Sequence, residues 1–103
     1  MILKEKRHRS QKILDSAKGQ PCTLRLHPEC NDNSVACHIS FRGGGYGTKP
    51  SDVFIAYGCN YCHDMIDGRI GHNFKSAELA IEKARAMQET IQSLLDNEIL
   101  TLP

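Results

Sequence analysis

Apolar and polar residues alternate in the middle of the chain, and this pattern predicts two short β-strands. Residues 35–41 alternate with a period of two. One face is expected to carry Val35, Cys37, Ile39 and Phe41, and the other Ala36, His38 and Ser40. A second strand is predicted at residues 53–57, after a loop with the sequence RGGGYGTKP. Residues 22–30 also alternate like a strand and turn at His27-Pro28.

Helical spacing of apolar residues predicts three helices around these strands. A short helix carries Ile13, Leu14 and Ala17, and a second one begins at the Cys59–Cys62 pair and ends at Gly68. A final helix, with Ser76 as its cap, is expected over about residues 76–98. Its apolar stripe consists of Ala80, Ala84, Met87, Ile91 and Leu94. This stripe could pack on its own domain or pair two chains as a dimer.

The length of 103 residues is enough for one domain with a modest core. We predict an α+β domain at residues 11–103, preceded by a basic N-terminal arm at residues 1–10. No apolar run approaches the roughly 18 residues that a membrane span needs. The N-terminal sequence MILKEKRHRS is charged after two apolar residues, which does not fit a secretory signal. We therefore expect a cytoplasmic protein without a membrane contact.

Positive charge is concentrated in the first half of the chain. Residues 1–49 contain nine Lys and Arg against four Asp and Glu, whereas residues 50–103 contain four against eight. A basic half suits a polyanion such as nucleic acid. An ordinary solvated surface could carry the same asymmetry, so the charge alone does not decide between the two.

The cysteines favour a structural zinc site. Cys59 and Cys62 form a Cys-x-x-Cys pair, which occurs in redox sites, zinc sites and, with a following His, haem attachment sites. A cytoplasmic location and an odd count of five cysteines argue against haem attachment and disulfides. No thioredoxin-like βαβ pattern accompanies the pair. Two thiolates at this short spacing can bind one zinc ion, with Cys22 and Cys30 completing a tetrahedron. Buried free thiols are the alternative.

Three further residues have the chemistry of a hydrolytic site. His63 and Asp67 are one helical turn apart and could hold one divalent cation that keeps open coordination positions. His38 points away from the apolar face of its strand, and a neutral imidazole can take a proton from water. A base beside a metal is an outline for phosphodiester hydrolysis. Alternatively, the acidic residues only favour the helix N-terminus and both histidines are structural or solvated.

Taken together, VACHIS, the glycine loop, Asp52 and CNYCHDMID resemble the HNH, or ββα-metal, nucleases. More narrowly, CTLRLHPECNDN…CHIS…GTKPSD…CNYCHDMIDGR is similar to the YbcO-like family of phage and prophage nucleases, over about residues 11–72. The resemblance implies a small zinc-stapled treble-clef or ββα-metal domain, here with additional N- and C-terminal helices.

The resemblance also implies a role for each matched residue. His38 corresponds to the general base, and His63 to a ligand of the catalytic metal, with Asp67 as a second ligand. Asp52 corresponds to the residue that fixes the loop bearing the base. The structural zinc ligands would be Cys22, Cys30, Cys59 and Cys62.

Cys37 departs from this pattern. HNH enzymes usually have Asp or His as a metal ligand immediately before the base, whereas this chain has Cys37. Its place in the strand alternation favours a buried thiol. If it were a ligand, it would favour zinc or another soft ion over magnesium.

The predicted function is that of a metal-dependent DNA endonuclease of phage or prophage type. It would use a structural Zn²⁺ and a catalytic cation such as Mg²⁺ or Mn²⁺, and act on duplex or branched DNA. The GGGYG segment would let the backbone approach the substrate or simply form a hairpin loop. Phosphate contacts are expected from Arg42, Lys49, Lys12 and Arg9. The alternatives are a non-catalytic zinc module that binds DNA or a protein, and a thiol redox protein.

Overall fold

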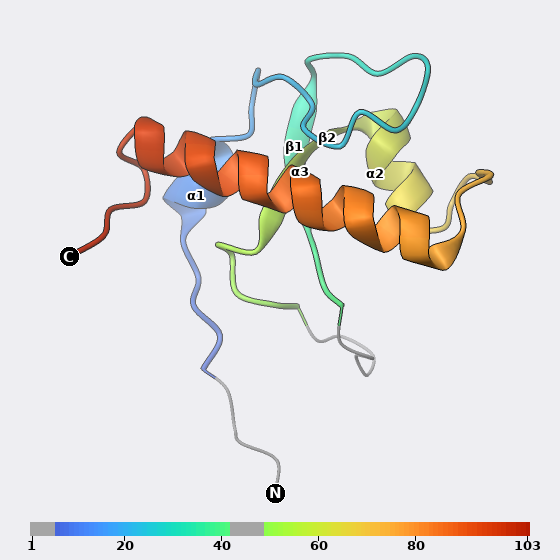
Figure 1. The fold of residues 1–103 in the computed structure, drawn as a ribbon. Coiled ribbons are helices and arrows are strands. Elements are labelled where there is room, and N and C mark those ends of the chain that lie inside the picture. The colour runs from blue at the N-terminus through green and yellow to red at the C-terminus, as the bar shows by residue number, and fades with distance from the viewer. Residues whose placement is uncertain (1–5, 42–48) are drawn as a thin grey trace, which may run out of the picture.

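The computed structural model describes residues 6–41 and 49–103, which form three helices and two strands (Figure 1). The elements are α1 (Gln11–Asp15), β1 (Ser34–His38), β2 (Ile55–Cys59), α2 (Asn60–Ile66) and α3 (Ser76–Asp96). The predicted small α+β fold is confirmed. Arg42 and the GGGYG segment lie outside the described residues.

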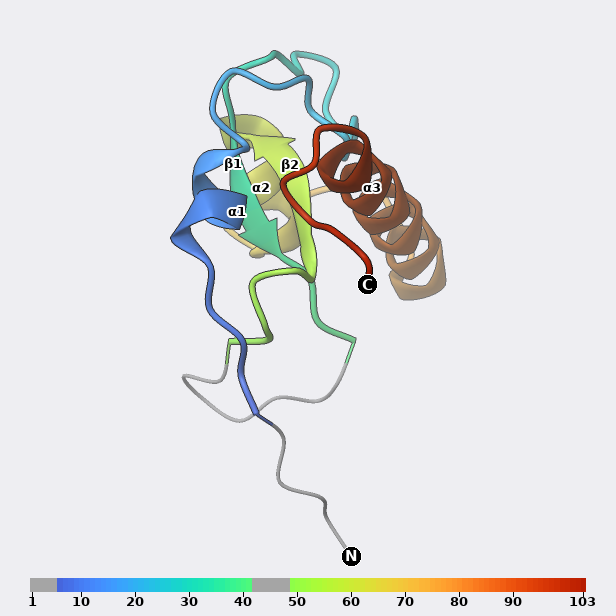
Figure 2. The ribbon, with the colours of Figure 1, turned by 90° about the vertical axis from the view of Figure 1, so that its left-hand side faces the viewer.

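The two strands form an antiparallel sheet in which Ser34 lies opposite Cys59, and His38 lies opposite Ile55. Figure 2 shows α1 and α3 on opposite sides of the strands. Cys59 is both the last residue of β2 and the N-cap of α2. The Cys-x-x-Cys pair therefore spans the junction between strand and helix, and α2 follows β2 without an intervening loop.

Two buried clusters lie on either side of β2, which is buried along its whole length. One cluster surrounds the cysteines and includes Leu24 and Ala56. The other consists of Ile13, Ala17, Ile55, Tyr57 and Leu94, from α1, β2 and α3. β2 is thus the central element, and the remaining elements pack around it.

Both strands differ from the predicted bounds. Cys37 and Ile39 are buried as predicted, but Val35 is 48% exposed and Phe41 is 53% exposed. These two residues lie near the start of β1 and beyond its end, so the core covers only the middle of the predicted face. β2 begins two residues later than predicted, because the Phe54 N–H donates to the Ser51 carbonyl at 3.0 Å and closes a turn there.

Residues 22–30 form a loop, so the predicted strand in this segment is wrong. The N–H groups of Thr23 and Leu24 both donate to one acceptor, the Tyr57 carbonyl, instead of forming a ladder. Arg25 has a φ of 47°, which an extended strand does not allow. The segment is held to α3 by Arg85, whose guanidinium donates to the Thr23 and Leu24 carbonyls at 2.8 Å each.

The buried face of α3 differs from the predicted stripe. Its buried residues are Ala86, Thr90 and Leu94, whereas Ala84 is exposed. The Thr90 hydroxyl accepts a hydrogen bond from the Tyr57 N–H at 3.2 Å and lies 2.9 Å from the Thr23 hydroxyl. A polar residue thus takes the central position of the contact, because the backbone of β2 and Thr23 satisfy its hydroxyl.

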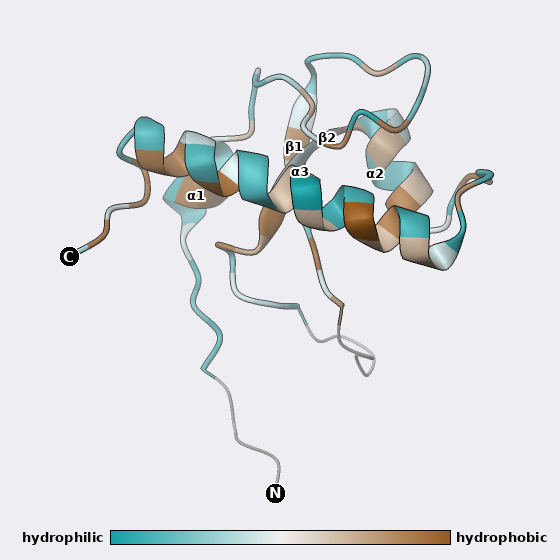
Figure 3. Ribbon diagram, in the orientation of Figure 1, coloured by the Kyte–Doolittle hydropathy of each residue, from teal (hydrophilic) through white to brown (hydrophobic). Residues whose placement is uncertain are grey.

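The face of α3 that is turned to the viewer in Figure 3 is mostly hydrophilic, with a hydrophobic segment in its N-terminal half. Ile81 is 68% exposed. Within the described residues, no helix combines the length and the apolar character that crossing a membrane would require.

Gly58 is required where β2 crosses the cysteine cluster. A Cβ atom at this position would lie 2.7 Å from the Cys37 Sγ and 2.7 Å from the Leu24 Cδ1. We therefore expect Gly58→Ala to lower the free energy of unfolding by about 1–3 kcal/mol through overpacking. Urea unfolding of the zinc-loaded protein measures this change. Gly71→Ala is the control, because a Cβ there has no neighbour within 4 Å. Equal stability of the two variants would contradict this account of the core.

Candidate functional site

The sulfur atoms of Cys22, Cys30, Cys59 and Cys62 all lie within 4.8 Å of one another. A tetrahedral zinc ion with Zn–S bonds of about 2.3 Å would place its sulfur ligands about 3.8 Å apart. Three of these cysteines are buried and Cys30 is half-buried. The predicted cluster is therefore confirmed as a group, and its geometry fits one structural zinc ion with no open position.

Backbone N–H groups surround this cluster. Cys22 Sγ accepts from the N–H groups of Arg25 at 3.5 Å and Cys59 at 3.4 Å. Cys62 Sγ accepts from the Leu26 N–H at 3.3 Å. Hydrogen bonds of this kind orient metal-bound thiolates and stabilise their charge. The loop that is present instead of the predicted strand thus directs its N–H groups to the cysteine sulfur atoms.

The pKa shifts of three of these thiols also fit a bound cation. Hydrogen bonds from the Cys62 thiol and from backbone N–H groups lower the pKa of Cys22 to about 4, despite burial. The hydrogen bond to Cys22 and burial raise the pKa of Cys62, while burial and Cys22 raise the pKa of Cys30 to about 12. The negative charge of an ionised Cys22 thus disfavours ionisation of the neighbouring thiols. A bound Zn²⁺ would compensate these charges and stabilise the folded chain.

Cys37 does not belong to this group of sulfur atoms. Its side chain is 1% exposed, and its Sγ lies 3.6 Å from the Val35 carbonyl oxygen. Burial and the charge of Asp67 raise the pKa of Cys37 to about 12. The structure thus places Cys37 in the core as a small apolar side chain.

A groove of about 570 Å³ lies next to the cluster, between α1, β1 and α2. It is lined by Leu14, Ala36, His38, Lys49, His63, Asp67 and Arg69. A second hollow, lined in part by Arg9 and Gln11, shares Leu14, His38 and Lys49 with it. The groove brings together the two histidines and the aspartate that the sequence predicts as a hydrolytic site.

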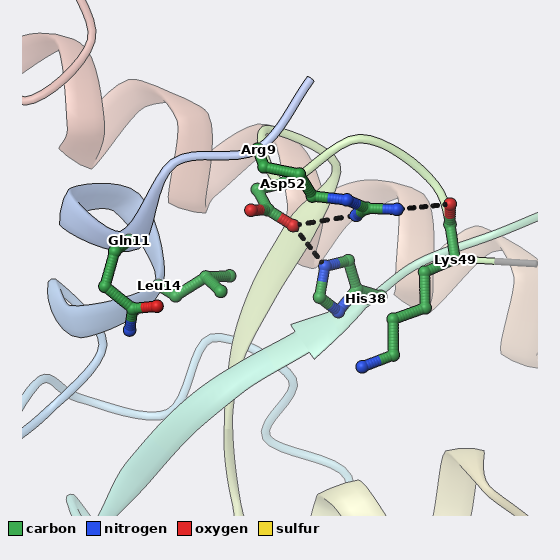
Figure 4. Close-up of a pocket in the computed structure, with 6 residues that line it drawn as sticks. All are labelled: Arg9, Gln11, Leu14, His38, Lys49 and Asp52. Carbon is green, nitrogen blue, oxygen red and sulfur yellow. Dashed lines mark hydrogen bonds and ion pairs between the residues drawn. The ribbon is translucent and has the colours of Figure 1, made fainter. Parts of the chain in front are cut away.

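His38 is held by the buried carboxylate of Asp52, with 2.9 Å between His38 Nε2 and Asp52 Oδ1 (Figure 4). Burial opposes the ionisation of Asp52, but hydrogen bonds from His38, the Ser10 N–H and Arg9 lower its pKa to about 2. An ionised carboxylate can only accept hydrogen bonds. In the neutral imidazole the proton is therefore on Nε2, and Nδ1 carries the free lone pair.

His63 and Asp67 form a second pair in the same groove. His63 Nε2 lies 3.1 Å from Asp67 Oδ2, and both side chains are about one-third exposed. Two adjacent ligands of an octahedral Mg²⁺, each about 2.1 Å from the ion, are about 3 Å apart. The His63–Asp67 separation is that of a direct ion pair or hydrogen bond, and it also equals the spacing of two adjacent ligands around one cation.

The predicted phosphate contacts lie in different surroundings. Lys49 lines the groove, and Lys12 is exposed on α1. Arg9 bonds to Asp52 and to backbone carbonyls, although sequence reasoning assigned it to phosphate. Arg69 was missed, and it lines the groove just beyond the turn at Gly68, whose φ is 77°. In the sequence, Arg69 could have been noticed from its position two residues after Asp67.

Fold and site together define a class: a small α+β domain with a cluster of four cysteines that could bind a metal, beside a groove lined by His and Asp. Within this class, the chain belongs to the family described as "Putative nuclease YbcO", whose model matches residues 11–98.

Relatives and a solved structure agree with this assignment. The chain is 43% identical over 58 residues to proteins named "Putative nuclease YbcO" from Escherichia coli (strain K12) and Enterobacteria phage 82. This match covers 52% of the chain and only 60% of the length of each relative. The fold is similar, with a TM-score of 0.65 and 27% identity, to a solved structure titled as that of "a putative bacteriophage protein" from E. coli K-12 MG1655. That similarity covers 82% of this chain and 98% of the other.

The two kinds of buried cysteine should differ in their effect on metal content. Wild-type protein is expected to contain one zinc ion per chain, and Cys62→Ala to lose it together with most of its stability. Cys37→Ala should retain the full zinc content, because Cys37 lies outside the cluster. Elemental analysis and thermal melting measure both effects. Loss of zinc from Cys37→Ala, or its retention in Cys62→Ala, would refute this ligand set.

Proposed function

We propose that this protein is a metal-dependent endonuclease of the HNH, or ββα-metal, type that hydrolyses phosphodiester bonds in duplex or branched DNA. The observation that carries the proposal is the single groove lined by His38, His63 and Asp67, in which Asp52 holds His38 from the adjoining hollow. One pair has the features of a general base, and the other those of a cation site. The order β1, β2, α2 supports a ββα-metal unit around them.

His38 acts as the general base in this proposal. The carboxylate of Asp52 keeps the proton on Nε2, so Nδ1 can take a proton from the attacking water. Asp52 also stabilises the imidazolium that forms, because its lowered pKa keeps the carboxylate ionised at neutral pH. This is a more direct role than fixing the loop that bears the base.

His63 and Asp67 hold the catalytic cation, and the groove binds the substrate around it. When bound, a cation such as Mg²⁺ or Mn²⁺ would stabilise the negative charge that develops on the phosphate and the leaving oxygen. Lys49 and Arg69 line the same groove and bind the neighbouring phosphates of the strand. Among the described residues, the His63–Asp67 pair supplies two ligands, so phosphate and water would take the other positions of the cation.

The names of the relatives add support to this proposal. Both curated relatives are named as nucleases, and one of them comes from a phage. The match covers only 60% of their length, so the activity of this chain rests on its own groove. The four-cysteine centre has no open position and serves the fold alone.

Plasmid cleavage tests the proposal. Wild-type protein should nick supercoiled DNA with Mg²⁺ or Mn²⁺ and not with EDTA. His38→Ala should lower the rate by about 10²–10⁴-fold, the usual contribution of a general base, with unchanged zinc content. Lys18→Ala is the control for truncation of a side chain outside the site, because Lys18 is exposed after α1 and lines neither hollow.

One result would overturn the nuclease assignment. If the folded, zinc-loaded protein cleaves neither plasmid nor branched DNA with any divalent cation, the chain is a non-catalytic zinc module. DNA binding by that inactive protein would then be measured directly. Equal cleavage by wild type and His38→Ala would instead reject His38 as the base.

A further inference from the structure

The segment before α1 is bonded along its length to the segment that carries Asp52. The His8 N–H donates to the Ser51 hydroxyl at 2.9 Å, and the Asp52 N–H donates to the His8 carbonyl at 2.8 Å. The Ser10 N–H donates to Asp52 Oδ2 at 2.8 Å. Residues 8–10, predicted as part of a basic arm, therefore hold the segment that carries Asp52, and Arg9 lines the hollow beside His38.

Arg9 provides the side-chain part of this connection. Its Nη1 lies 3.0 Å from Asp52 Oδ1 and 2.7 Å from the Pro50 carbonyl oxygen, while its Nη2 lies 3.2 Å from the Lys49 carbonyl oxygen. Asp52 Oδ1 is the same oxygen that bonds to His38 Nε2. Figure 4 shows the guanidinium and the imidazole approaching the carboxylate of Asp52 together.

We infer that Arg9 is a positioning residue that fixes His38 through Asp52, and that its guanidinium is not a phosphate contact. The catalytic consequence rests on the proposed nuclease function, whereas the effect on His38 does not. Three donors hold the two carboxylate oxygens of Asp52: Arg9, the Ser10 N–H and His38. With all three in place, the carboxylate has one orientation, and it presents Oδ1 to the imidazole.

The arrangement needs the shape of arginine as well as its charge. The two Nη atoms of Arg9 reach a carboxylate and two backbone carbonyls at once, which joins Asp52 to residues 49 and 50. A lysine ammonium is a single point of charge and cannot span these acceptors. The Asp52 side chain is 4% exposed and that of Arg9 is 48% exposed, so Arg9 lies between the carboxylate and solvent.

Loss of Arg9 should therefore change the protonation pattern of His38 at constant pH. Several other charged groups line the groove around His38, namely Lys49, His63, Asp67 and Arg69. A measurement of the tautomer at one pH at which the imidazole is neutral avoids their titration. The ring-nitrogen chemical shifts of His38 report this tautomer directly.

The experiment compares Arg9→Gln and Arg9→Lys with wild type by ¹⁵N NMR of the histidine rings, in zinc-loaded full-length protein. Wild type should show protonated Nε2 and unprotonated Nδ1 in His38. In Arg9→Gln the two shifts should move towards each other, as expected for exchange between tautomers, and Arg9→Lys should restore them only in part. Lys18→Gln is the control with the same loss of charge. Wild-type shifts in both Arg9 variants would overturn the inference.

Cleavage kinetics separate the two roles of Arg9. A positioning role lowers kcat by about 10- to 100-fold, the typical effect of outer-shell partners, with KM nearly unchanged. A phosphate contact raises KM and leaves both kcat and the His38 shifts unchanged, which would refute the inference. If wild type cleaves no DNA, the proposed function fails, and the NMR comparison alone decides whether Arg9 positions His38.

Discussion

The rest of the fold depends on one constraint: four cysteine sulfur atoms lie within 4.8 Å of one another. It ties the loop at residues 22–30 to the end of β2 and the start of α2. The domain is small and its sheet has only two strands, so burial of apolar surface alone gives limited stability. A zinc ion at the cluster would bind only the folded chain, and its binding free energy would then add to folding.

This constraint also positions the groove. Cys62 belongs to the cluster, and His63 follows it on the same short helix, with Asp67 one turn further. The opposite wall depends on Asp52, a buried carboxylate that bonds to Arg9, Ser10 and His38. The His63–Asp67 pair is thus positioned by the helix that starts in the cysteine cluster, and the proposed base is held by a buried carboxylate.

The sequence is most informative where chemistry and spacing coincide. The Cys-x-x-Cys pair and the alternation around Cys37 predicted a strand and helix junction, which the structure contains. The strand at residues 22–30 was wrong because one carbonyl, that of Tyr57, takes two N–H groups, and sulfur acceptors, which a periodicity rule does not consider, take those of Arg25 and Leu26. The predicted apolar stripe on α3 omitted Thr90, because threonine counts as polar. Its hydroxyl is nevertheless buried, since it accepts a hydrogen bond from the backbone of β2. The Arg9–Asp52 bond joins residues 43 positions apart, so only the fold reveals it.

The central claim is that one chain holds two metals in different roles, a structural zinc ion and a catalytic cation beside His38. Anomalous diffraction from crystals grown with Mn²⁺ tests it directly, with data collected at the zinc and manganese absorption edges. The account requires a zinc peak among the four cysteine sulfur atoms and a manganese peak bound by His63 and Asp67. A zinc peak without manganese in the groove would contradict the catalytic cation site, and absence of the zinc peak would contradict the structural centre.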